Sequence, residues 1–318
     1  MPFFMPFRKM KITIRVLLGC VFMLSAILKL IDMDSFELFI FKSFEFNWIL
    51  TGVLCRLLVS IELGLGIFYI VGAQLAMTNL ISGLLILLMS FWLVYQLFLG
   101  NTENCHCFGE IISFSPHQAL IKNIILLLFI GFLHKLKDPS IVLLPPKFRV
   151  GTIVFLIIVV LLLPAIISPP DFLFPDRYTV EGVTKKINFD EIEQTPWHMS
   201  DNAVDLRQGK KIVMFLSMNC EMCQKASKKA AVMNNRQGDT LPIYFIFFGK
   251  EEGMNGFWEK TTSHKFPYKI ISADLFFSTT KLLPTIFFLK DGKIEKVLGY
   301  RNFDDGVVKE FLNEHSEN

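Results

Sequence analysis

Residues 211–223 read Lys211-Ile-Val-Met-Phe-Leu-Ser-Met-Asn219-Cys220-Glu-Met-Cys223, and this stretch decides the fold of the C-terminal part. The apolar run before the cysteines has the length of a strand, and the residues after them have the composition of a helix. A cysteine at such a junction lies beside the unpaired N–H groups and the positive end of the helix, which stabilise its thiolate. We therefore predict that Cys220 is a nucleophile and that Cys223 resolves the disulfides that Cys220 forms.

Two other interpretations of this cysteine pair are a fixed disulfide and half of a zinc site. A zinc ribbon needs a second CxxC about 15 to 20 residues away, and the sequence has none at that spacing. The strand-to-helix setting therefore favours a redox pair, and we predict no metal site.

Further strands are predicted at 241–248 and 282–289, and Asp291-Gly292 is typical of a hairpin turn before another strand. This order, with CxxC at a helix start and Pro-Thr opening a later strand, resembles the thioredoxin fold over about the last 130 residues. In that family a cis proline lies beside the active disulfide, and the backbone before it hydrogen bonds to a bound partner. The resemblance implies that Leu283 and Pro284 bind the substrate.

One position departs from the thioredoxin pattern. Thioredoxins keep a buried acid six residues before the first cysteine, and here that position is Met214. Proton transfer from Cys223 would then depend on Glu221, Lys225 or water. The departure also supports a non-catalytic alternative, in which the domain is a binding module.

The rest of the chain has the composition of a membrane protein. The 318 residues are 52% hydrophobic and 19% charged, with a mean hydropathy of +0.47, whereas soluble proteins have about a quarter charged residues. The net charge of +3 comes without a basic patch with interleaved aromatics, which excludes a nucleic-acid partner. Five stretches are long enough to cross a hydrocarbon layer of about 30 Å as helices, namely 12–31, 49–71, 74–98, 118–134 and 150–167.

The charges of the loops predict the orientation of these spans. The N-terminal tail and the loop after the fourth span are rich in Lys and Arg, whereas the segments 32–47 and 100–118 are acidic or lack basic residues. We therefore predict a protein of the inner membrane. The positive-inside rule then places its N-terminus in the cytoplasm and its C-terminal domain in the periplasm. Both cysteine motifs lie on that oxidising side, where disulfide chemistry is sustained.

The second cysteine motif is Asn104-Cys105-His106-Cys107-Phe108-Gly109 between the third and fourth spans. A CxC disulfide closes a small, strained ring that is easy to reduce. We therefore predict that Cys105 and Cys107 relay electrons, and His106 is interpreted either as a group that favours the thiolate or as a solvated loop residue.

The CxCFG signature, with charged residues embedded in the first two spans, resembles the MauE branch of the DoxX-like membrane proteins over residues 10–135. The resemblance implies a four-helix bundle like that of quinone-linked disulfide enzymes, and a role in maturing disulfide-rich proteins such as the small subunit of methylamine dehydrogenase. We expect an all-α membrane part followed by an α/β thioredoxin-like domain. The parts are a MauE/DoxX-like four-helix domain at 1–138, a fifth transmembrane helix and linker at 139–170, and a thioredoxin-like domain at 171–318.

Charged residues within the spans cost about 2.5 to 3.5 kcal/mol each and need partners. The favoured interpretation has Lys29 reaching the membrane surface and an arginine, Arg56 or Arg15, paired with Glu62. The functional alternative has Lys29 and Arg56 lining a quinone head-group pocket under the CxC loop. Free buried cysteines behave as small apolar residues, so we assign no chemistry to the two that lie within spans, Cys20 and Cys55.

Together these features predict a thiol-disulfide oxidoreductase in the bilayer. Cys220 would exchange disulfides with a thiol-containing client, the CxC pair would exchange with Cys220 and Cys223, and a membrane carrier such as a quinone would complete the relay. No covalently bound cofactor is expected. The direction of electron flow is not set by the CxxC residues, because potentials within this fold differ by about 150 mV. The alternative is a non-catalytic membrane scaffold or transporter.

Overall fold

The structure of the protein, a computed structural model, describes residues 4–72, 74–100, 105, 107–109, 112, 114–135, 149–173, 187–199, 204–261 and 266–313. These residues form two compact units. The first contains Met1–Phe39 and Gly52–Pro169, and the second contains Ile40–Thr51 and Pro170–Asn318. The three-part division of the sequence stays a prediction.

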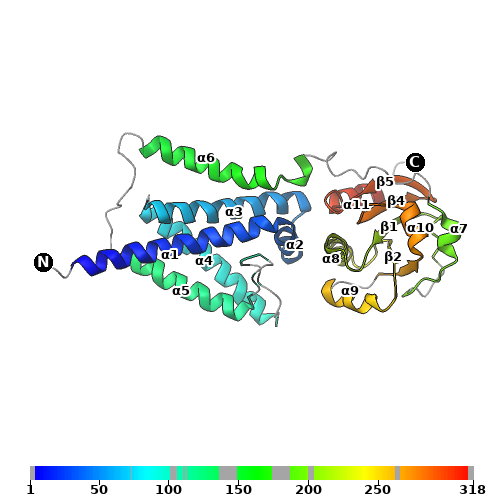
Figure 1. The fold of residues 1–318 in the computed structure, drawn as a ribbon, viewed down its shortest axis with the longest axis horizontal. Helices are drawn as coiled ribbons and strands as arrows, with labels where there is room; N and C mark the ends of the chain where they lie inside the picture. The colour runs from blue at the N-terminus through cyan, green and yellow to red at the C-terminus, as the bar shows by residue number, and fades with distance from the viewer. Residues whose placement is uncertain are drawn as a thin grey trace. The chain divides into compact units, whose positions relative to one another are not determined.

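The N-terminal part of the chain is helical (Figure 1). Its helices are α1 (Phe4–Ile31), α2 (Met33–Ser43), α3 (Trp48–Val71), α4 (Leu75–Phe98), α5 (Pro116–Lys135) and α6 (Arg149–Ile167). Five of these, all except α2, are long and apolar enough to cross a membrane. They begin and end within a few residues of the predicted spans, apart from α1, which begins at Phe4. The prediction of a multi-pass membrane protein is confirmed.

Helix α2 corrects one expectation, because the segment 32–47 was predicted to be only a loop between spans. Met33, Phe36 and Phe41 recur at helical spacing and are buried, so the segment has an apolar helical face that packing stabilises. Its acidic residues suggested a solvated loop, and the helical period was missed.

Helices α4 and α6 show most plainly that the first unit needs a bilayer. Only 17% of the apolar window of α4 and 11% of that of α6 is buried inside the protein. Large side chains such as Leu88, Phe91 and Phe155 are exposed. Such continuous apolar surface is stable in hydrocarbon and not in water.

The second unit is built on one five-stranded sheet with the order β3-β2-β1-β4-β5. Strands β1, β2 and β3 pair in parallel, and β4 and β5 pair antiparallel to their neighbours. The strands are β1 (Lys210–Leu216), β2 (Ile243–Phe248), β3 (Tyr268–Ile271), β4 (Thr285–Lys290) and β5 (Lys293–Leu298). The helices are α7 (Phe189–Glu193), α8 (Glu221–Arg236), α9 (Gly253–Thr261), α10 (Ala273–Thr279) and α11 (Asp305–Asn313), and a short 3-10 turn, η2, covers Asp171–Leu173.

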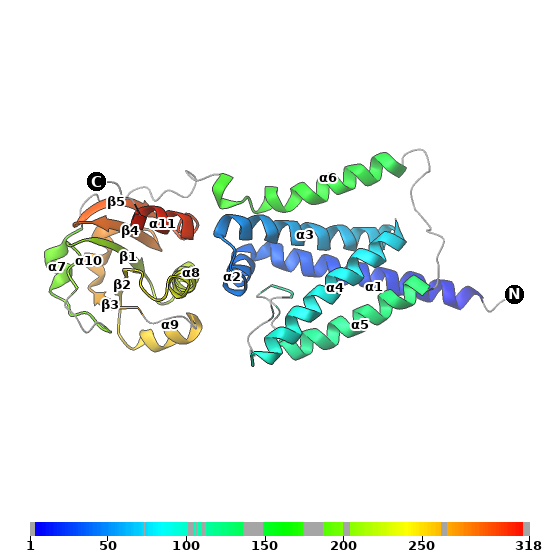
Figure 2. The same cartoon turned by 180° about the vertical axis from the view of Figure 1, so that it is seen from behind.

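Helices cover both faces of this sheet, with α8, α9 and α11 on one face and α7 and α10 on the other (Figure 2). Alternate residues of β1 therefore enter different cores: Met214 packs toward α8, whereas Val213 and Phe215 pack on the opposite face. This period of two, with both faces buried, is what a central strand requires. The predicted thioredoxin-like α/β domain is confirmed.

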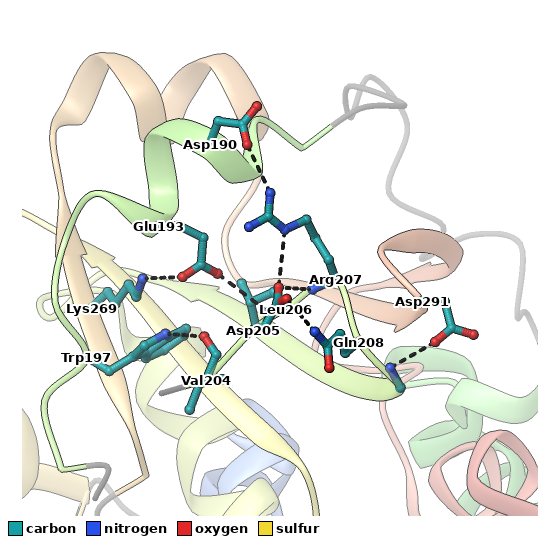
Figure 3. A network of polar contacts seen from close by, with 11 residues as sticks. Asp190, Glu193, Trp197, Val204, Asp205, Leu206, Arg207, Gln208, Lys269 and Asp291 are labelled. Carbon is teal, nitrogen blue, oxygen red and sulfur yellow. Dashed lines mark hydrogen bonds and ion pairs between the residues drawn. The ribbon is translucent and has the colours of Figure 1, made fainter. Parts of the chain in front are cut away.

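A polar network fixes the segment before β1 on the sheet face that α7 and α10 cover (Figure 3). Lys269 of β3 is 1% exposed, and its ammonium group lies 3.2 Å from a carboxylate oxygen of Glu193 and 4.6 Å from the ring of Trp197. It also donates to the Ile192 carbonyl oxygen at 3.1 Å. A buried lysine is tolerated only when it is paired in this way.

The hairpin between β4 and β5 forms where Asp291-Gly292 predicts it. Both residues have positive φ, 48° for Asp291 and 74° for Gly292, as a type I′ turn requires. Asp291 also accepts a hydrogen bond from the Gly209 N–H at 2.9 Å, which ties the turn to the start of β1.

Candidate functional site

Cys220 is the N-cap residue of α8, at the end of the loop that leaves β1. Its φ of −83° and ψ of 116° are extended, and its sulfur accepts the backbone N–H of Cys223 at 3.2 Å. The Cys220 side chain thus occupies the place that Ser, Thr, Asp or Asn fills at most helix starts. This capping position directs the first N–H groups of the helix toward the Cys220 sulfur.

These contacts make Cys220 the more acidic of the two thiols. A hydrogen bond from the Cys223 side chain, joined by the backbone N–H groups of Cys223 and Met222, lowers the pKa of Cys220 to about 6. Burial raises the pKa of Cys223, and its hydrogen bond to Cys220 adds to that rise. At neutral pH the pair therefore holds one thiolate nucleophile and one buried thiol, as disulfide exchange requires.

Met214 lies in the apolar core next to the helix that carries the cysteines. It is 0% exposed and belongs to the same buried cluster as Cys223 and Ala226. The thioether therefore fills the place of the acid expected in thioredoxins and supplies no proton acceptor there. Lys225, suggested from the sequence as a substitute, is 2.9 Å from Glu221 one turn back on the same helix.

The predicted substrate-binding residues precede β4. Leu283 packs against the cluster that contains the cysteines, and its peptide bond to Pro284 is cis. Two buried threonines fix this segment, because the Thr280 and Thr285 hydroxyls lie 2.7 Å apart and within 3.1 and 2.6 Å of the Leu282 carbonyl oxygen, so that one hydroxyl donates to the other and the other donates to the carbonyl oxygen. Sequence reasoning missed this pair, although Thr285 follows the proline directly.

The second cysteine pair lies in the segment between α4 and α5. The Cys105 N–H donates to the Phe114 carbonyl oxygen at 3.0 Å, and the Cys107 N–H donates to the Cys105 sulfur at 3.3 Å. Gly109 has φ +70°, and a Cβ there would lie 3.1 Å from the Leu28 carbonyl oxygen of α1. Glycine is therefore needed for both conformation and close approach. His106 lies outside the described residues.

The two sulfurs of this pair also differ in acidity. A hydrogen bond from Cys105 is the main cause that lowers the pKa of Cys107 to about 7, and the charges of Lys122 and Lys29 add to it. The same hydrogen bond and burial raise the pKa of Cys105. The CxC pair thus repeats the asymmetry of the CxxC pair, with one sulfur inclined to ionise beside one that keeps its proton.

Lys29 and Glu62 form a buried ion pair beneath Cys107. The Lys29 Nζ and the Glu62 Oε1 are 2.6 Å apart, and the two residues are 2% and 7% exposed. The Ser25 hydroxyl lies 3.0 Å from Glu62 Oε2 and 2.9 Å from the carbonyl oxygen of Cys107. Lys29 is therefore buried and pairs with Glu62 inside the protein, which corrects the favoured interpretation that gave Glu62 an arginine as its partner.

Arg56 pairs with Glu37, which corrects the expected pairing with Glu62. Its guanidinium group also donates to the Gly52 carbonyl oxygen at 2.7 Å, to that of Ser168 at 2.7 Å and to that of Pro169 at 3.0 Å. These contacts satisfy the charge and join the ends of α3 and α6. The structure thus places Arg56 in a helix-holding role.

The cavity next to Cys107 has a volume of about 50 Å³. Its polar lining comes from Ser25, Lys29, Glu62, Lys122 and Asn123, and Arg56 does not line it. An engineered cavity of about 150 Å³ binds benzene, so this cavity is smaller than one known to hold a six-membered ring. A larger apolar cavity of about 340 Å³ lies between α3, α4 and α6, but no cysteine lines it. The quinone stays a prediction, and no step is derived through it.

Sequence reasoning missed Ser25 and Lys122. Ser25 is four residues before Lys29 and so shares its helix face, which was an available signal. Lys122 lies six residues into α5, and its ammonium group is 4.6 Å from the Phe108 ring centre. Its contact with the loop depends on how α5 packs, so the sequence gives no sign of it.

Comparison with known proteins finds similarity in both parts of the chain. Residues 8–136 match the family Methylamine utilisation protein MauE. The chain therefore joins a membrane region similar to MauE proteins to a thioredoxin-like domain. It is also 28% identical, over 89% of each chain, to Protein TlpB of Flavobacterium psychrophilum.

Solved structures with similarity to the chain match its C-terminal part. The thioredoxin domain of a thiol-disulfide oxidoreductase from Bacteroides vulgatus is 20% identical and covers 37% of this chain and 94% of its own, with a TM-score of 0.30. A thiol:disulfide interchange protein from Bacteroides sp. is 19% identical and covers 44% and 92%, with a TM-score of 0.31. The sheet order and the capping position of Cys220 carry the assignment of the thioredoxin-like fold.

Proposed function

We propose that this MauE-thioredoxin fusion is a membrane-anchored thiol-disulfide relay with two stations. One observation carries the proposal: the two sulfurs at the start of α8 differ in setting, because the half-buried Cys220 caps the helix and accepts the backbone N–H of Cys223 at 3.2 Å, whereas the Cys223 thiol is buried. A fixed structural disulfide needs no such asymmetry, whereas exchange needs a thiolate to attack and a second thiol to resolve.

At the first station, the Cys220 thiolate attacks a disulfide of a client protein. A bond forms between Cys220 and one client sulfur, and the other client sulfur leaves as a thiolate. Cys223 then attacks Cys220 and releases the reduced client, so two electrons leave Cys220 and Cys223 and their disulfide forms. The reverse sequence oxidises a client by the same contacts.

At the second station, the Cys107 thiolate attacks Cys220 of the Cys220–Cys223 disulfide, and Cys223 leaves as a thiolate. Cys105 resolves the mixed disulfide, so the CxC pair is oxidised and the CxxC pair is reduced by two electrons. Loop charges support an inner-membrane protein with a cytoplasmic N-terminus and both stations in the periplasm. Clients are thiol-containing proteins of that compartment, and the MauE match suggests disulfide-rich subunits of the methylamine dehydrogenase type.

A trapping experiment tests the first station. Cys223→Ser leaves Cys220 able to attack but removes the resolving thiol, so covalent adducts that reducing agent cleaves accumulate and appear on non-reducing gels. Cys55→Ser is the matched control, because it removes a buried cysteine that belongs to neither pair, and it gives no adducts. A Cys223→Ser protein that is folded and free of adducts favours the non-catalytic scaffold.

The second station is tested in the same way. Cys105→Ser combined with Cys223→Ser leaves one exchanging sulfur in each pair, and the expected product is a Cys107–Cys220 disulfide identified by peptide mass spectrometry. The absence of that link after mild oxidation contradicts transfer between the stations.

A further inference from the structure

The proton count around Ser25 points to a role for the buried Glu62. A serine hydroxyl carries a single proton, yet the Ser25 oxygen lies within hydrogen-bond distance of two oxygens, Glu62 Oε2 and the Cys107 carbonyl. The carbonyl oxygen only accepts. Ser25 can therefore donate to only one of them. Both contacts are hydrogen bonds only when Glu62 carries a proton and donates it to Ser25, while Ser25 donates to the Cys107 carbonyl oxygen.

Two hydrogen-bond patterns follow. When Glu62 is a carboxylate, it accepts from both Ser25 and Lys29, and the Cys107 carbonyl loses its partner from Ser25. When Glu62 is a carboxylic acid, it donates to Ser25, Ser25 donates to Cys107, and Lys29 still donates to the other carboxyl oxygen. One added proton completes every bond in this group.

The cavity beneath the loop connects that proton to Cys107. Glu62 and Cys107 both line it, and a volume of about 50 Å³ has room for roughly three water molecules. Among the described residues, the ionisable groups that face it are Lys29 and Glu62 from the first two spans, Lys122 from α5, and Cys107, with Cys105 beside it. Helix α4 contributes only apolar side chains, Leu85, Ile86 and Met89.

We propose that Glu62 is the proton acceptor for Cys107, with Lys29 and Ser25 as its positioning residues. The step is Cys107–SH plus Glu62–COO⁻ giving Cys107–S⁻ plus Glu62–COOH. The net charge of the site does not change, because one negative charge moves from the carboxylate to the sulfur. The inference deepens the proposed function and rests on it, since Cys107 needs a proton acceptor only if it exchanges disulfides.

A shared proton has a distinctive pH profile. While one proton is divided between Glu62 and Cys107, the thiolate fraction of Cys107 does not depend on pH. The alkylation rate of Cys107 should therefore show a shelf at acidic pH before it rises to its full value. A cysteine that ionises alone instead loses about tenfold in rate for each pH unit below its pKa.

The experiment measures iodoacetamide alkylation of each cysteine between pH 5 and pH 9, in the reduced full chain in detergent micelles, by peptide mass spectrometry. The shelf should be present in the unmodified chain and lost in Glu62→Gln, whose rate at Cys107 falls about tenfold per pH unit. Glu37→Gln is the matched control, because it neutralises the other buried carboxylate paired with a basic residue and should keep the shelf. Ser25→Ala leaves the ion pair intact and should lower the shelf, which keeps the test open if Glu62→Gln does not fold.

A single tenfold-per-unit slope in the unmodified chain overturns the inference, and so does a shelf that survives in Glu62→Gln or disappears equally in Glu37→Gln. Disulfide transfer between the two cysteine pairs is measured in the same samples. A Glu62-dependent shelf without any transfer contradicts the relay and leaves the proton coupling in place. Transfer without a shelf contradicts the proton coupling alone.

Discussion

Replacing Cys223 by alanine should raise the pKa of Cys220, because the Cys223 side chain is the largest cause of its lowering. With a pKa of about 6, the thiolate of Cys220 outnumbers its thiol about tenfold at pH 7. The backbone N–H groups of Met222 and Cys223 remain in the variant, so the pKa should stop short of the ordinary value and reach about 7 to 8. The thiolate fraction at pH 6 should then fall at least fivefold, roughly.

The assay is the alkylation rate of Cys220 between pH 4 and pH 10, read by peptide mass spectrometry on the reduced chain. Cys223→Ser is the matched comparison, because its hydroxyl keeps a donor near the Cys220 sulfur. Its midpoint should lie between those of the unmodified chain and of Cys223→Ala. Identical midpoints in all three proteins would refute the argument, since the side-chain donor would then have no part in stabilising the thiolate.

Three other substitutions, each with a comparison substitution, test the packing of the two units. Phe215→Ala should destabilise the thioredoxin-like unit by about 3 to 5 kcal/mol in denaturant unfolding, because this ring is fully buried, whereas truncating the 41%-exposed Phe277 should cost much less. Lys29→Met should cost about 3 to 5 kcal/mol in denaturant unfolding, because it removes the cation that pairs with the buried Glu62. Lys296→Met, which breaks an exposed pair with Glu310, should cost under about 1 kcal/mol in the same assay. Gly109→Ala should cost about 1 to 2 kcal/mol from its positive φ and should also displace the Cys107 loop from α1. Gly100→Ala, with φ +70° and open space around it, should carry the backbone cost alone. Equal alkylation of Cys107 in both variants would contradict the role of close approach.

Several features of the protein are determined by short stretches of its sequence. The membrane helices follow from runs of apolar residues, since hydrocarbon thickness fixes their length. The position of Cys220 at a helix start follows from the apolar strand before it. The turn at Asp291-Gly292 follows from the preference of this residue pair for two successive positive φ angles. These are local properties, and the structure confirms them.

Tertiary structure decided what the charged and polar groups do. The sequence shows that Lys29, Arg56 and Glu62 need partners, but the partners depend on how each helix is rotated about its axis and which helices are neighbours. Packing paired Lys29 with Glu62 and Arg56 with Glu37, and it brought Ser25 to the Cys107 carbonyl, 82 residues along the chain. The hydropathy of a segment specifies that its helix lies in lipid. A hydrogen bond between two helices instead requires a donor and an acceptor about 3 Å apart, and that distance depends on both helices and not on the sequence of either one alone.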